Sequence, residues 1–356
     1  PRAEALAKDG KSVVLGNSVD LGGRRVIKKK VGNAVPEAEQ GLQFGRIIAA
    51  KALGIEVAGI TINRYCASGL ESIATATAKI RSGMAECIIA GGTESMSLVP
   101  TAGWKTVPSY AIAKEEPDYY LSMGLTAEAV AKEFNISRED QDAFAYASHM
   151  KAKTAIENGY FKSGILPIAV EETYVNEKGK KAVRSYTVDT DEGLRADTTV
   201  EGLSKLKAAF AVGGSVTAGN SSQTSDGAAF ALVMSERMML SLGLTPIGRL
   251  VNCASAGVHP RIMGIGPVAA IPKVLKQAGM NLGDIDLFEL NEAFASQSLA
   301  VIRELGLDAT KVNINGGAIA LGHPLGCTGC KLTVQLLNDM KRLNKKYGMV
   351  TACVGG

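Results

Sequence analysis

The spacing of hydrophobic and polar residues changes several times along the chain and predicts strands that alternate with helices. "EVAGITIN" (56–63) has the composition of a strand and leads into a small-residue helix from about Cys66 to Arg81. "AECIIAGG" (85–92) is a continuous apolar run that ends on glycines, as in a strand buried on both faces. This order predicts an α/β fold.

Residues 99–212 differ in character from their flanks. They hold the only Trp, several Tyr and an amphipathic helix that Ser137 and Asp140 start as a capping box and Gly159 ends. We interpret this stretch as an insertion. The predicted organisation is an N-terminal half (1–98 with 213–238), an inserted loop domain (99–212) and a C-terminal half (239–356).

The last third of the chain repeats the order of the first. "KVNINGGAIALGHPLGCTGCKLTVQLLNDMKR" and "YGMVTACVGG" follow the order of "ITINRYCASGLESIATATAKIRSG" and "AECIIAGG". In both, a polar group precedes a helix, and the next strand ends in glycines. Two such halves would place both helix N-termini at a shared interface, where ligands of α/β sheets usually bind.

Composition describes an ordinary soluble globular protein of 356 residues, with 46% hydrophobic and 21% charged residues. The net charge of +4 would suit anionic small molecules but is too small for a nucleic-acid footprint. No stretch is long and apolar enough to span a membrane, and "PRAEALAKDG" lacks the pattern of a signal peptide.

The six cysteines form no disulfide framework of the secreted type, so we expect a reducing compartment, the cytoplasm of a bacterial-type protein. Because the chain opens on Pro1, a trimmed leader and an organellar matrix stay open. Cys327 and Cys330 form a C-x-x-C, which is a weak signal for redox chemistry or a metal site because no second pair accompanies it.

Cys66 and His323 are the main candidates for chemistry. Cys66 lies between a polar turn and a helix, where N-terminal amides favour a thiolate, although a structural cysteine would fit as well. His323 lies among glycines before the matching helix of the second half. A His beside a Cys is the usual way to generate a thiolate near neutral pH.

The sequence gives weaker support for a chemical role of the other polar side chains. His149 and His259 are expected at the surface or its boundary. Cys353 ends a buried strand, where a core hydrophobe is the commoner role, yet it lies toward the strand's C-terminal end, where sites form. Asn291 follows the apolar "IDLFEL" and could orient a water or cap the next helix, and the sequence alone favours capping.

Six motifs in register resemble the thiolase family: "NRYCASGL", "GGTESMS", "GNSSQTSDGAA", "NEAFASQ", "GGAIALGHPLGCTG" and "CVGG". From about Val31 onward, nearly the whole chain follows the family's order. The resemblance implies a five-layered α-β-α-β-α fold from two similar halves, with a loop domain inserted in the first.

The resemblance also implies roles. Cys66 matches the nucleophile that becomes acylated, His323 the base that takes its proton, and Cys353 the acid/base that moves the α-proton of the acetyl-CoA unit. Asn291 matches the residue that holds a water and forms one oxyanion hole with His323. The backbone amides of Cys66 and Gly355 match the other hole. The residues implied along the CoA pantetheine are Met123, Phe210, Ser222 and Phe294.

The implied reaction is thiolytic cleavage of a 3-ketoacyl-CoA in fatty acid β-oxidation, without metal and with CoA as substrate rather than separate cofactor. Biosynthetic members usually have His-Pro-Ile-Gly-Ala-Ser-Gly in place of "HPLGCTG" (323–329) and His before the Met-Gly of "LSMG" (121–124), which favours the degradative type. The alternatives are a biosynthetic acetoacetyl-CoA thiolase, a catalytically silent acyl-CoA-binding protein and, last, a redox protein.

The family's assemblies imply a homodimer or homotetramer, with a β-oxidation enzyme as a further candidate partner. The sequence departs from the family pattern where it begins at "PR", where it stops at Gly356, and at "RRVIKKKVGNAVPEAEQ", which joins a basic helix end to what should be the end of a strand. We therefore expect residues to be missing near Lys30 and at both ends, leaving both sheets one strand short with exposed edges.

Overall fold

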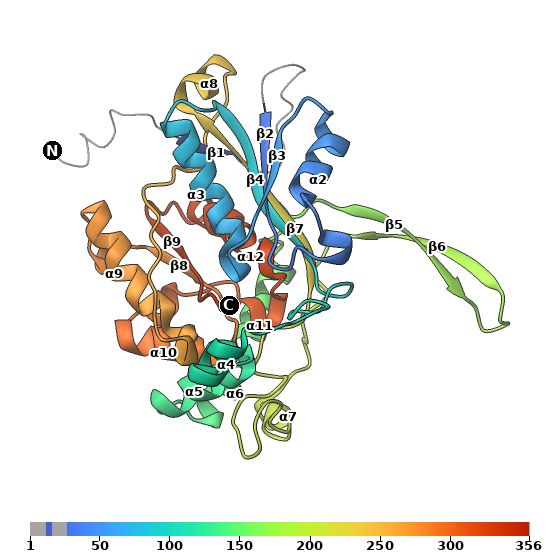
Figure 1. Ribbon diagram of the computed structural model, residues 1–356, viewed down its shortest axis with the longest axis vertical. Coiled ribbons are helices and arrows are strands. Elements are labelled where there is room, and N and C mark those ends of the chain that lie inside the picture. The colour runs from blue at the N-terminus through green and yellow to red at the C-terminus, as the bar shows by residue number, and fades with distance from the viewer. Residues whose placement is uncertain (1–11, 16–26, 356) are drawn as a thin grey trace.

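The computed structural model describes residues 12–15 and 27–355 (Figure 1). The strands are β1 (Ser12–Leu15), β2 (Ile27–Gly32), β3 (Gly59–Ile62), β4 (Cys87–Ser95), β5 (Ile168–Val175), β6 (Lys181–Val188), β7 (Asp226–Ser235), β8 (Leu287–Leu290) and β9 (Gly348–Thr351). The helices are α2 (Phe44–Leu53), α3 (Ser68–Arg81), α4 (Tyr110–Glu115), α5 (Met123–Glu133), α6 (Arg138–Glu157), α7 (Val200–Ser204), α8 (Glu236–Ser241), α9 (Gly266–Ala278), α10 (Ala295–Leu305), α11 (Ala318–Leu321) and α12 (Leu325–Arg342). Short 3-10 turns are η1 (Ala38–Gln40), η2 (Tyr65–Ala67), η3 (Pro117–Tyr120), η4 (Pro260–Ile265), η5 (Leu282–Asp284) and η6 (Ala309–Lys311).

Two sheets and three helix layers form the body of the molecule. Within the described ranges the first sheet has the order β1-β7-β4-β2-β3, with β2 parallel to β3 and β4, and β7 antiparallel to β4 and β1. The parallel pair β8 and β9 forms the second sheet. Helix α2 packs on the first sheet, α3 and α12 lie between the sheets, and α9 and α10 cover β8 (Figure 1). The predicted five-layered α-β-α-β-α fold is confirmed.

The first turns of α3 and α12 meet at the centre, as the repeat in the sequence predicts, and glycines make this possible. A β-carbon added to Gly69 of α3 would lie 2.6 Å from the backbone nitrogen of Cys330 in α12. One added to Gly329 would overlap the backbone of Leu70, and one added to Gly92 of β4 would overlap the carbonyl oxygen of Gly326. The two halves therefore touch through their backbones.

Strand β2 corrects one expectation. Its six residues pair along their whole length with β4, so the strand before Gly32 is present and the basic stretch is the strand itself. Lys29 and Lys30 are only 7% and 3% exposed. The Lys29 ammonium lies 4.5 Å from the centre of the Phe230 ring, a cation–π contact. A sheet interior thus holds two lysines where apolar side chains are the rule.

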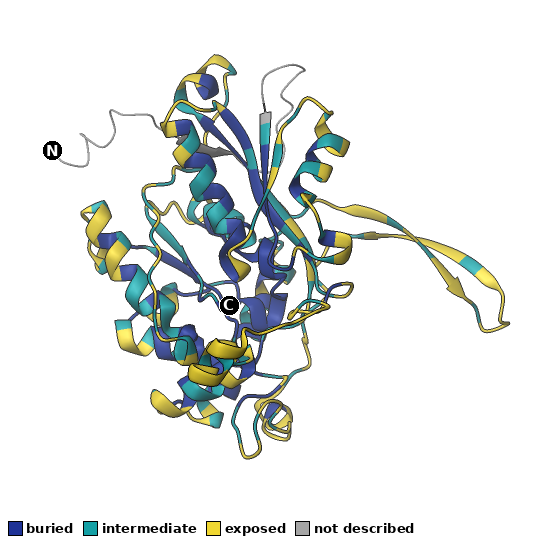
Figure 2. Ribbon diagram, in the orientation of Figure 1, coloured by how far each residue is buried: buried dark blue, intermediate teal, exposed yellow. Residues whose placement is uncertain are grey.

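The inserted region packs on the second half through its helices. Helices α5 and α6 contact α10, whereas the antiparallel hairpin β5–β6 projects from the body and is largely exposed (Figure 2). The Ser137 hydroxyl accepts a hydrogen bond from the Asp140 N–H at the start of α6, and Gly159 has a φ of +70° just after its end. The caps are thus as predicted, while the division into domains stays a prediction.

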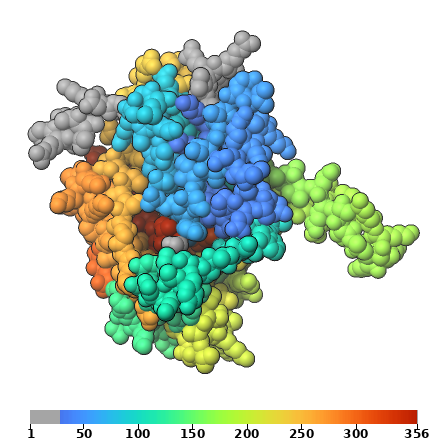
Figure 3. Space-filling model, in the orientation of Figure 1, coloured from blue at the N-terminus to red at the C-terminus, as the bar shows by residue number. Residues whose placement is uncertain are grey.

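Each sheet was expected to lack a strand. Among the described residues, no strand pairs with the outer edge of β9 in the second sheet, as expected, whereas the first sheet has β1 as an edge strand beside β7. Residues 249–258 alternate between exposed and half-buried positions and form no backbone ladder with β9. A cleft of about 1010 Å³ lies between this segment, α3 and β9, and it reaches Met123 and Gly355. Figure 3 shows the hollow, with residues from the C-terminal end at its floor. Whether residues are missing from the sequence stays a prediction.

Candidate active site

The turn that carries Cys66 is held by local hydrogen bonds. Tyr65 has a φ of +39°, a left-handed conformation that costs energy for a side chain of this size and is common at functional sites. Its N–H donates to Asn63 Oδ1 (2.9 Å), and the Ser68 hydroxyl donates to the Tyr65 carbonyl (2.7 Å). Cys66 therefore lies in η2, two residues before α3 begins at Ser68, although the predicted helix begins at about Cys66, and it packs in a cluster with Val35 and Leu325.

The Cys66 sulfur lies in a buried pocket with two backbone N–H groups, its own and that of Gly355. Burial raises the pKa of this thiol to about 12, and the two amides only partly oppose the rise. Burial thus opposes the thiolate that the amides at the helix N-terminus were expected to favour. Desolvation outweighs the amides, so Cys66 rests as a neutral thiol.

His323 lies in the turn between α11 and α12 and has a partner on each ring nitrogen. Its Nδ1 is 2.6 Å from Thr328 Oγ1, and its Nε2 is 3.2 Å from Asn291 Nδ2. Burial, followed by the positive charge of Lys331, lowers the pKa of His323 to about 3. The imidazole is therefore neutral and able to accept a proton.

Asn291 does not cap a helix. It follows β8 directly, its N–H donates to the Thr351 carbonyl of β9 (2.9 Å), and α10 begins only at Ala295. The capping interpretation is wrong because four residues separate the strand from the helix. The side chain is free to face His323 instead, and its Oδ1 has no protein partner.

Cys353 lies two residues after β9 and packs against Met263 and Ala293. Burial, followed by the neighbouring Cys66 thiol, raises the pKa of Cys353 above the usual range. The end of this second-half strand thus brings a second thiol near Cys66 of the first half.

The four predicted CoA residues gather beside Cys353. Met123 and Phe294 pack against the Cys353 cluster, and Phe210 meets Phe294 edge to face at 6.0 Å between ring centres. The Ser222 N–H donates to the Ala293 carbonyl (3.0 Å), next to Phe294. Because Phe210 is 41% exposed, the group runs from the surface to the buried thiol.

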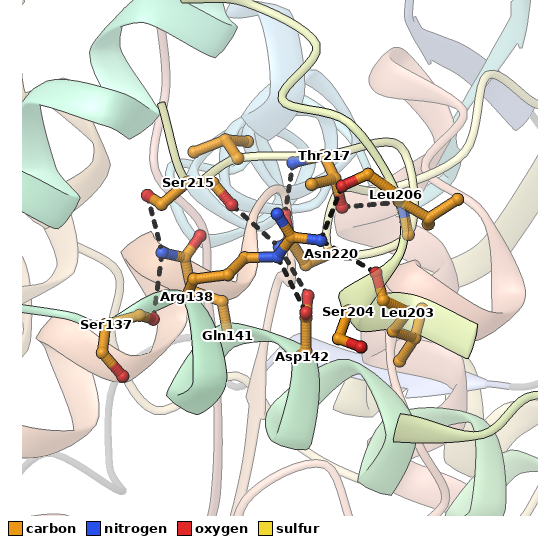
Figure 4. Close-up of polar contacts among 12 residues, drawn as sticks. Ser137, Arg138, Gln141, Asp142, Leu203, Ser204, Leu206, Ser215, Thr217 and Asn220 are labelled. Atoms are coloured by element: carbon orange, nitrogen blue, oxygen red, sulfur yellow. Dashed lines mark hydrogen bonds and ion pairs between the residues drawn. The ribbon is translucent and has the colours of Figure 1, made fainter. Parts of the chain in front are cut away.

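A buried polar network supports the segments that carry Phe210 and Ser222 (Figure 4). Arg138 donates to Asp142 (2.7 Å) and to the carbonyls of Leu203 and Leu206 (2.8 and 2.9 Å). Asn220 donates to Asp142 (2.9 Å) and accepts from the Thr217 N–H (2.7 Å). Sequence reasoning missed this network, and only the Asn of "GNSSQTSDGAA" could have signalled it.

Two buried glutamates were also missed. Glu94 of β4 accepts hydrogen bonds from the N–H groups of Ala34 (2.7 Å) and Gly326 (2.8 Å), which ties the start of α12 to the first sheet. Glu292 accepts from Ser148 (2.7 Å) and Asn313 (2.8 Å). Their positions inside "GGTESMS" and "NEAFASQ" were the available signal.

The remaining candidates lie elsewhere. His149 is buried, contrary to expectation, and its Nδ1 accepts from the Arg195 N–H (3.3 Å), whereas His259 is exposed as predicted. Cys327 and Cys330 are free, buried thiols of α12, and burial raises the pKa of Cys327 to about 12. In the part of the chain that the structure describes, no cluster of three His, Cys, Asp or Glu is placed to hold a metal ion, and no helix could cross a bilayer.

Family models match both halves of the chain. The model for the thiolase N-terminal domain matches residues 6–237, and the model for the thiolase C-terminal domain matches residues 244–356. The chain belongs to the thiolase family.

Relatives of this thiolase carry two kinds of name. It is 56% identical to a 3-ketoacyl-CoA thiolase of Bacillus subtilis (strain 168) over 327 residues, which are 92% of this chain and 84% of the relative. It is 48% identical to an acetyl-CoA acetyltransferase of Pseudomonas aeruginosa, over 90% of this chain and 82% of the relative. The crystal structure of human mitochondrial 3-ketoacyl-CoA thiolase aligns with a TM-score of 0.82 and 38% identity, over 92% of this chain and 84% of the other.

Proposed function

We propose that this thiolase cleaves 3-ketoacyl-CoA with CoA to acetyl-CoA and a shortened acyl-CoA, as an acyltransferase of fatty acid degradation. The observation that carries the proposal is the Cys66 thiol, which faces the backbone N–H of Gly355 with Cys353 beside it. Both the name of the Bacillus subtilis relative and that of the human structure support the degradative type over the biosynthetic one.

In the first half-reaction the Cys66 sulfur attacks the 3-keto carbon while its proton passes to Nε2 of His323. The C2–C3 bond then breaks, Cys66 keeps the acyl group as a thioester, and Cys353 protonates the enolate of the departing acetyl-CoA. Because both partners rest neutral in a buried site, proton transfer accompanies attack rather than preceding it.

In the second half-reaction CoA takes the acyl group. Cys353, left as a thiolate, accepts the proton of the incoming CoA thiol, whose sulfur attacks the Cys66 thioester. His323 returns its proton to Cys66 as that sulfur departs. Every group regains its starting state, and CoA serves as substrate and product, so the cycle needs no metal or separate cofactor.

Two sets of donors would stabilise the negative oxygens of these steps. The backbone amides of Cys66 and Gly355 form one, and the protonated Nε2 of His323 with a water held by Asn291 forms the other. One such donor typically contributes about 10²–10³-fold to the rate. Met123, Phe210, Ser222 and Phe294 would hold the pantetheine arm, which leads from the surface to the thiols.

The test is thiolysis of a medium-chain 3-ketoacyl-CoA, followed by loss of the substrate's enolate absorbance after adding CoA. We expect rapid loss that Cys66→Ala abolishes. Acetoacetyl-CoA is the short comparison, because the Pseudomonas aeruginosa relative is named an acetyl-CoA acetyltransferase. Turnover confined to acetoacetyl-CoA would replace the degradative assignment, and no turnover of either would favour a silent acyl-CoA-binding protein.

We further propose that the enzyme works as a homodimer or homotetramer in a reducing compartment, the bacterial cytoplasm or an organellar matrix. Its six cysteines, free in the structure, support the reducing compartment. A mass measured in solution by light scattering at micromolar concentration tests the assembly, and a monomer would overturn it.

A further inference from the structure

Two successive hydrogen bonds, a short relay, link Nδ1 of His323 through Thr328 to the carbonyl of Pro324. Thr328 Oγ1 lies 2.9 Å from the carbonyl oxygen of Pro324 and 2.6 Å from Nδ1 of His323. A hydroxyl has one hydrogen to donate, and a carbonyl oxygen can only accept. The Thr328 hydrogen therefore goes to Pro324, and its oxygen accepts the hydrogen of Nδ1.

The other ring nitrogen fits this assignment. The Asn291 amide nitrogen lies 3.2 Å from Nε2, so it donates to a nitrogen that carries a lone pair. Thr328, His323 and Asn291 are all buried, so no solvent competes for these bonds. Each donor of the relay has one acceptor, and the far end is a backbone carbonyl in the first turn of α12, which cannot change its role.

We propose that Thr328 is a positioning residue that fixes His323 in the Nδ1–H tautomer and so keeps a lone pair, rather than a hydrogen, on Nε2, the atom that takes the Cys66 proton in the proposed reaction. This inference deepens the proposed function, because it rests on His323 as the base of that reaction. In the opposite tautomer the lone pair would point at α12, and Nε2 would have no capacity to take a proton.

The first test reads the tautomer directly and needs no activity. In protein labelled with ¹⁵N at histidine, the shifts of the two ring nitrogens distinguish Nδ1–H from Nε2–H. The chain has only three histidines, and loss of one set in His323→Asn assigns the signal. We expect Nδ1–H in the wild type and in Thr328→Ser, and a mixture of tautomers in Thr328→Val. An Nε2–H wild type would overturn the proposal.

The second test is kinetic. Loss of a residue that orients a functional histidine typically costs about 10–100-fold, so Thr328→Val should lower kcat by that factor with KM nearly unchanged. Thr328→Ser should restore kcat to within about threefold of wild type, because it keeps the hydroxyl. A Thr328→Val enzyme with wild-type kcat and a single tautomer would contradict the proposal.

Thr333→Val is the matched control. Thr333 lies on the same helix, and its hydroxyl makes the same bond to the carbonyl four residues back, that of Gly329 (2.8 Å), without contacting a histidine. In Thr333→Val the His323 tautomer signal and kcat should equal those of the wild type. An equal loss of kcat in Thr328→Val and Thr333→Val would show a general effect on the helix and would contradict the proposal. If the wild type fails to turn over any 3-ketoacyl-CoA, the proposed function fails while the NMR result still decides the tautomer.

Discussion

The two helix junctions that meet at the centre hold their functional groups in different ways. The Cys66 sulfur meets two backbone N–H groups, its own and that of Gly355, while the turn around it is fixed by the side chains of Asn63 and Ser68. His323 is held by side chains, with Thr328 on one ring nitrogen and Asn291 on the other. A backbone contact survives substitution of the residue that supplies it, whereas a side-chain contact does not. The contacts to the His323 ring should therefore be more sensitive to substitution than the two amides that face the Cys66 sulfur.

The largest expected effect is at the nucleophile itself. Cys66→Ala removes the atom that carries the acyl group, so thiolysis should fall by about 10⁴-fold or more. Because alanine fits the small apolar site, the melting temperature and CoA binding should change little, which calorimetry can measure. Residual activity within tenfold of wild type would move the nucleophile to another cysteine.

Asn291→Ala tests the side-chain-held junction. It removes the donor at Nε2 and the group that would hold the oxyanion water, so kcat should fall by about 10²–10³-fold. Asn281→Ala is the control, because this exposed asparagine only caps η5. A loss below threefold for Asn291→Ala would mean that the histidine does not depend on this side chain.

The pH dependence of Cys66 sharpens the comparison. Its pKa of about 12 in the free enzyme means that the thiolate fraction rises about tenfold per pH unit between pH 6 and 9. Alkylation of Cys66 by iodoacetamide, followed by mass spectrometry, should rise with that slope and without a plateau. A plateau with a midpoint near pH 7 would show that His323 already ionises the thiol at rest.

Phe210→Ala probes the outer end of the site. It removes the ring that packs edge to face on Phe294 at the outer end of the proposed pantetheine site, and a lost ligand contact of about 0.5–1.5 kcal/mol would be roughly two- to tenfold in affinity. KM for CoA should rise by that factor with kcat nearly unchanged. Tyr186→Ala on the exposed hairpin is the control, and equal effects from the two would remove Phe210 from the CoA site.

The smallest effect on activity is expected beneath the nucleophile helix, at Lys30. Burial, followed by the charge of Lys79, lowers the pKa of Lys30 from 10.5 to about 8. Between these values the unfolded chain binds more protons, so stability should rise as pH rises from about 8 to 10.5 and be lowest below pH 8. Lys30→Met should abolish that rise and add about 1–3 kcal/mol near pH 7.

Urea unfolding at several pH values measures this, with Lys28→Met as the control, because Lys28 is less buried and bonds the Met84 carbonyl. A variant less stable than wild type would mean that the ammonium is stabilised where it lies. Activity of Lys30→Met at pH 7 should match wild type, because the turn that carries Cys66 makes no hydrogen bond to this side chain.

Much of the fold could be predicted from the sequence, because long periodic segments such as the Ser137-capped helix and the "AECIIAGG" strand carry strong local signals. The candidate site residues were predicted through their motifs, and the structure brings Cys66, Cys353 and Gly355 together. What local patterns could not give were effects of tertiary burial: the raised pKa of the Cys66 thiol, the buried His149 and the lysines of β2. Asn291 was taken for a cap because the four-residue gap before α10 is invisible in the sequence.

The contact between the first turns of α3 and α12 determines the distance between Cys66 and His323 in the active site. Gly69, Gly92 and Gly329 leave no side chain between the halves, so the spacing of nucleophile and base is fixed by main-chain thickness. Substitutions at the exposed outer end of the site, around Phe210, can therefore be used to change acyl specificity. They leave the distance between Cys66 and His323 unchanged. A single methyl group at any of the three glycines would instead meet backbone atoms of the other half and push the halves apart.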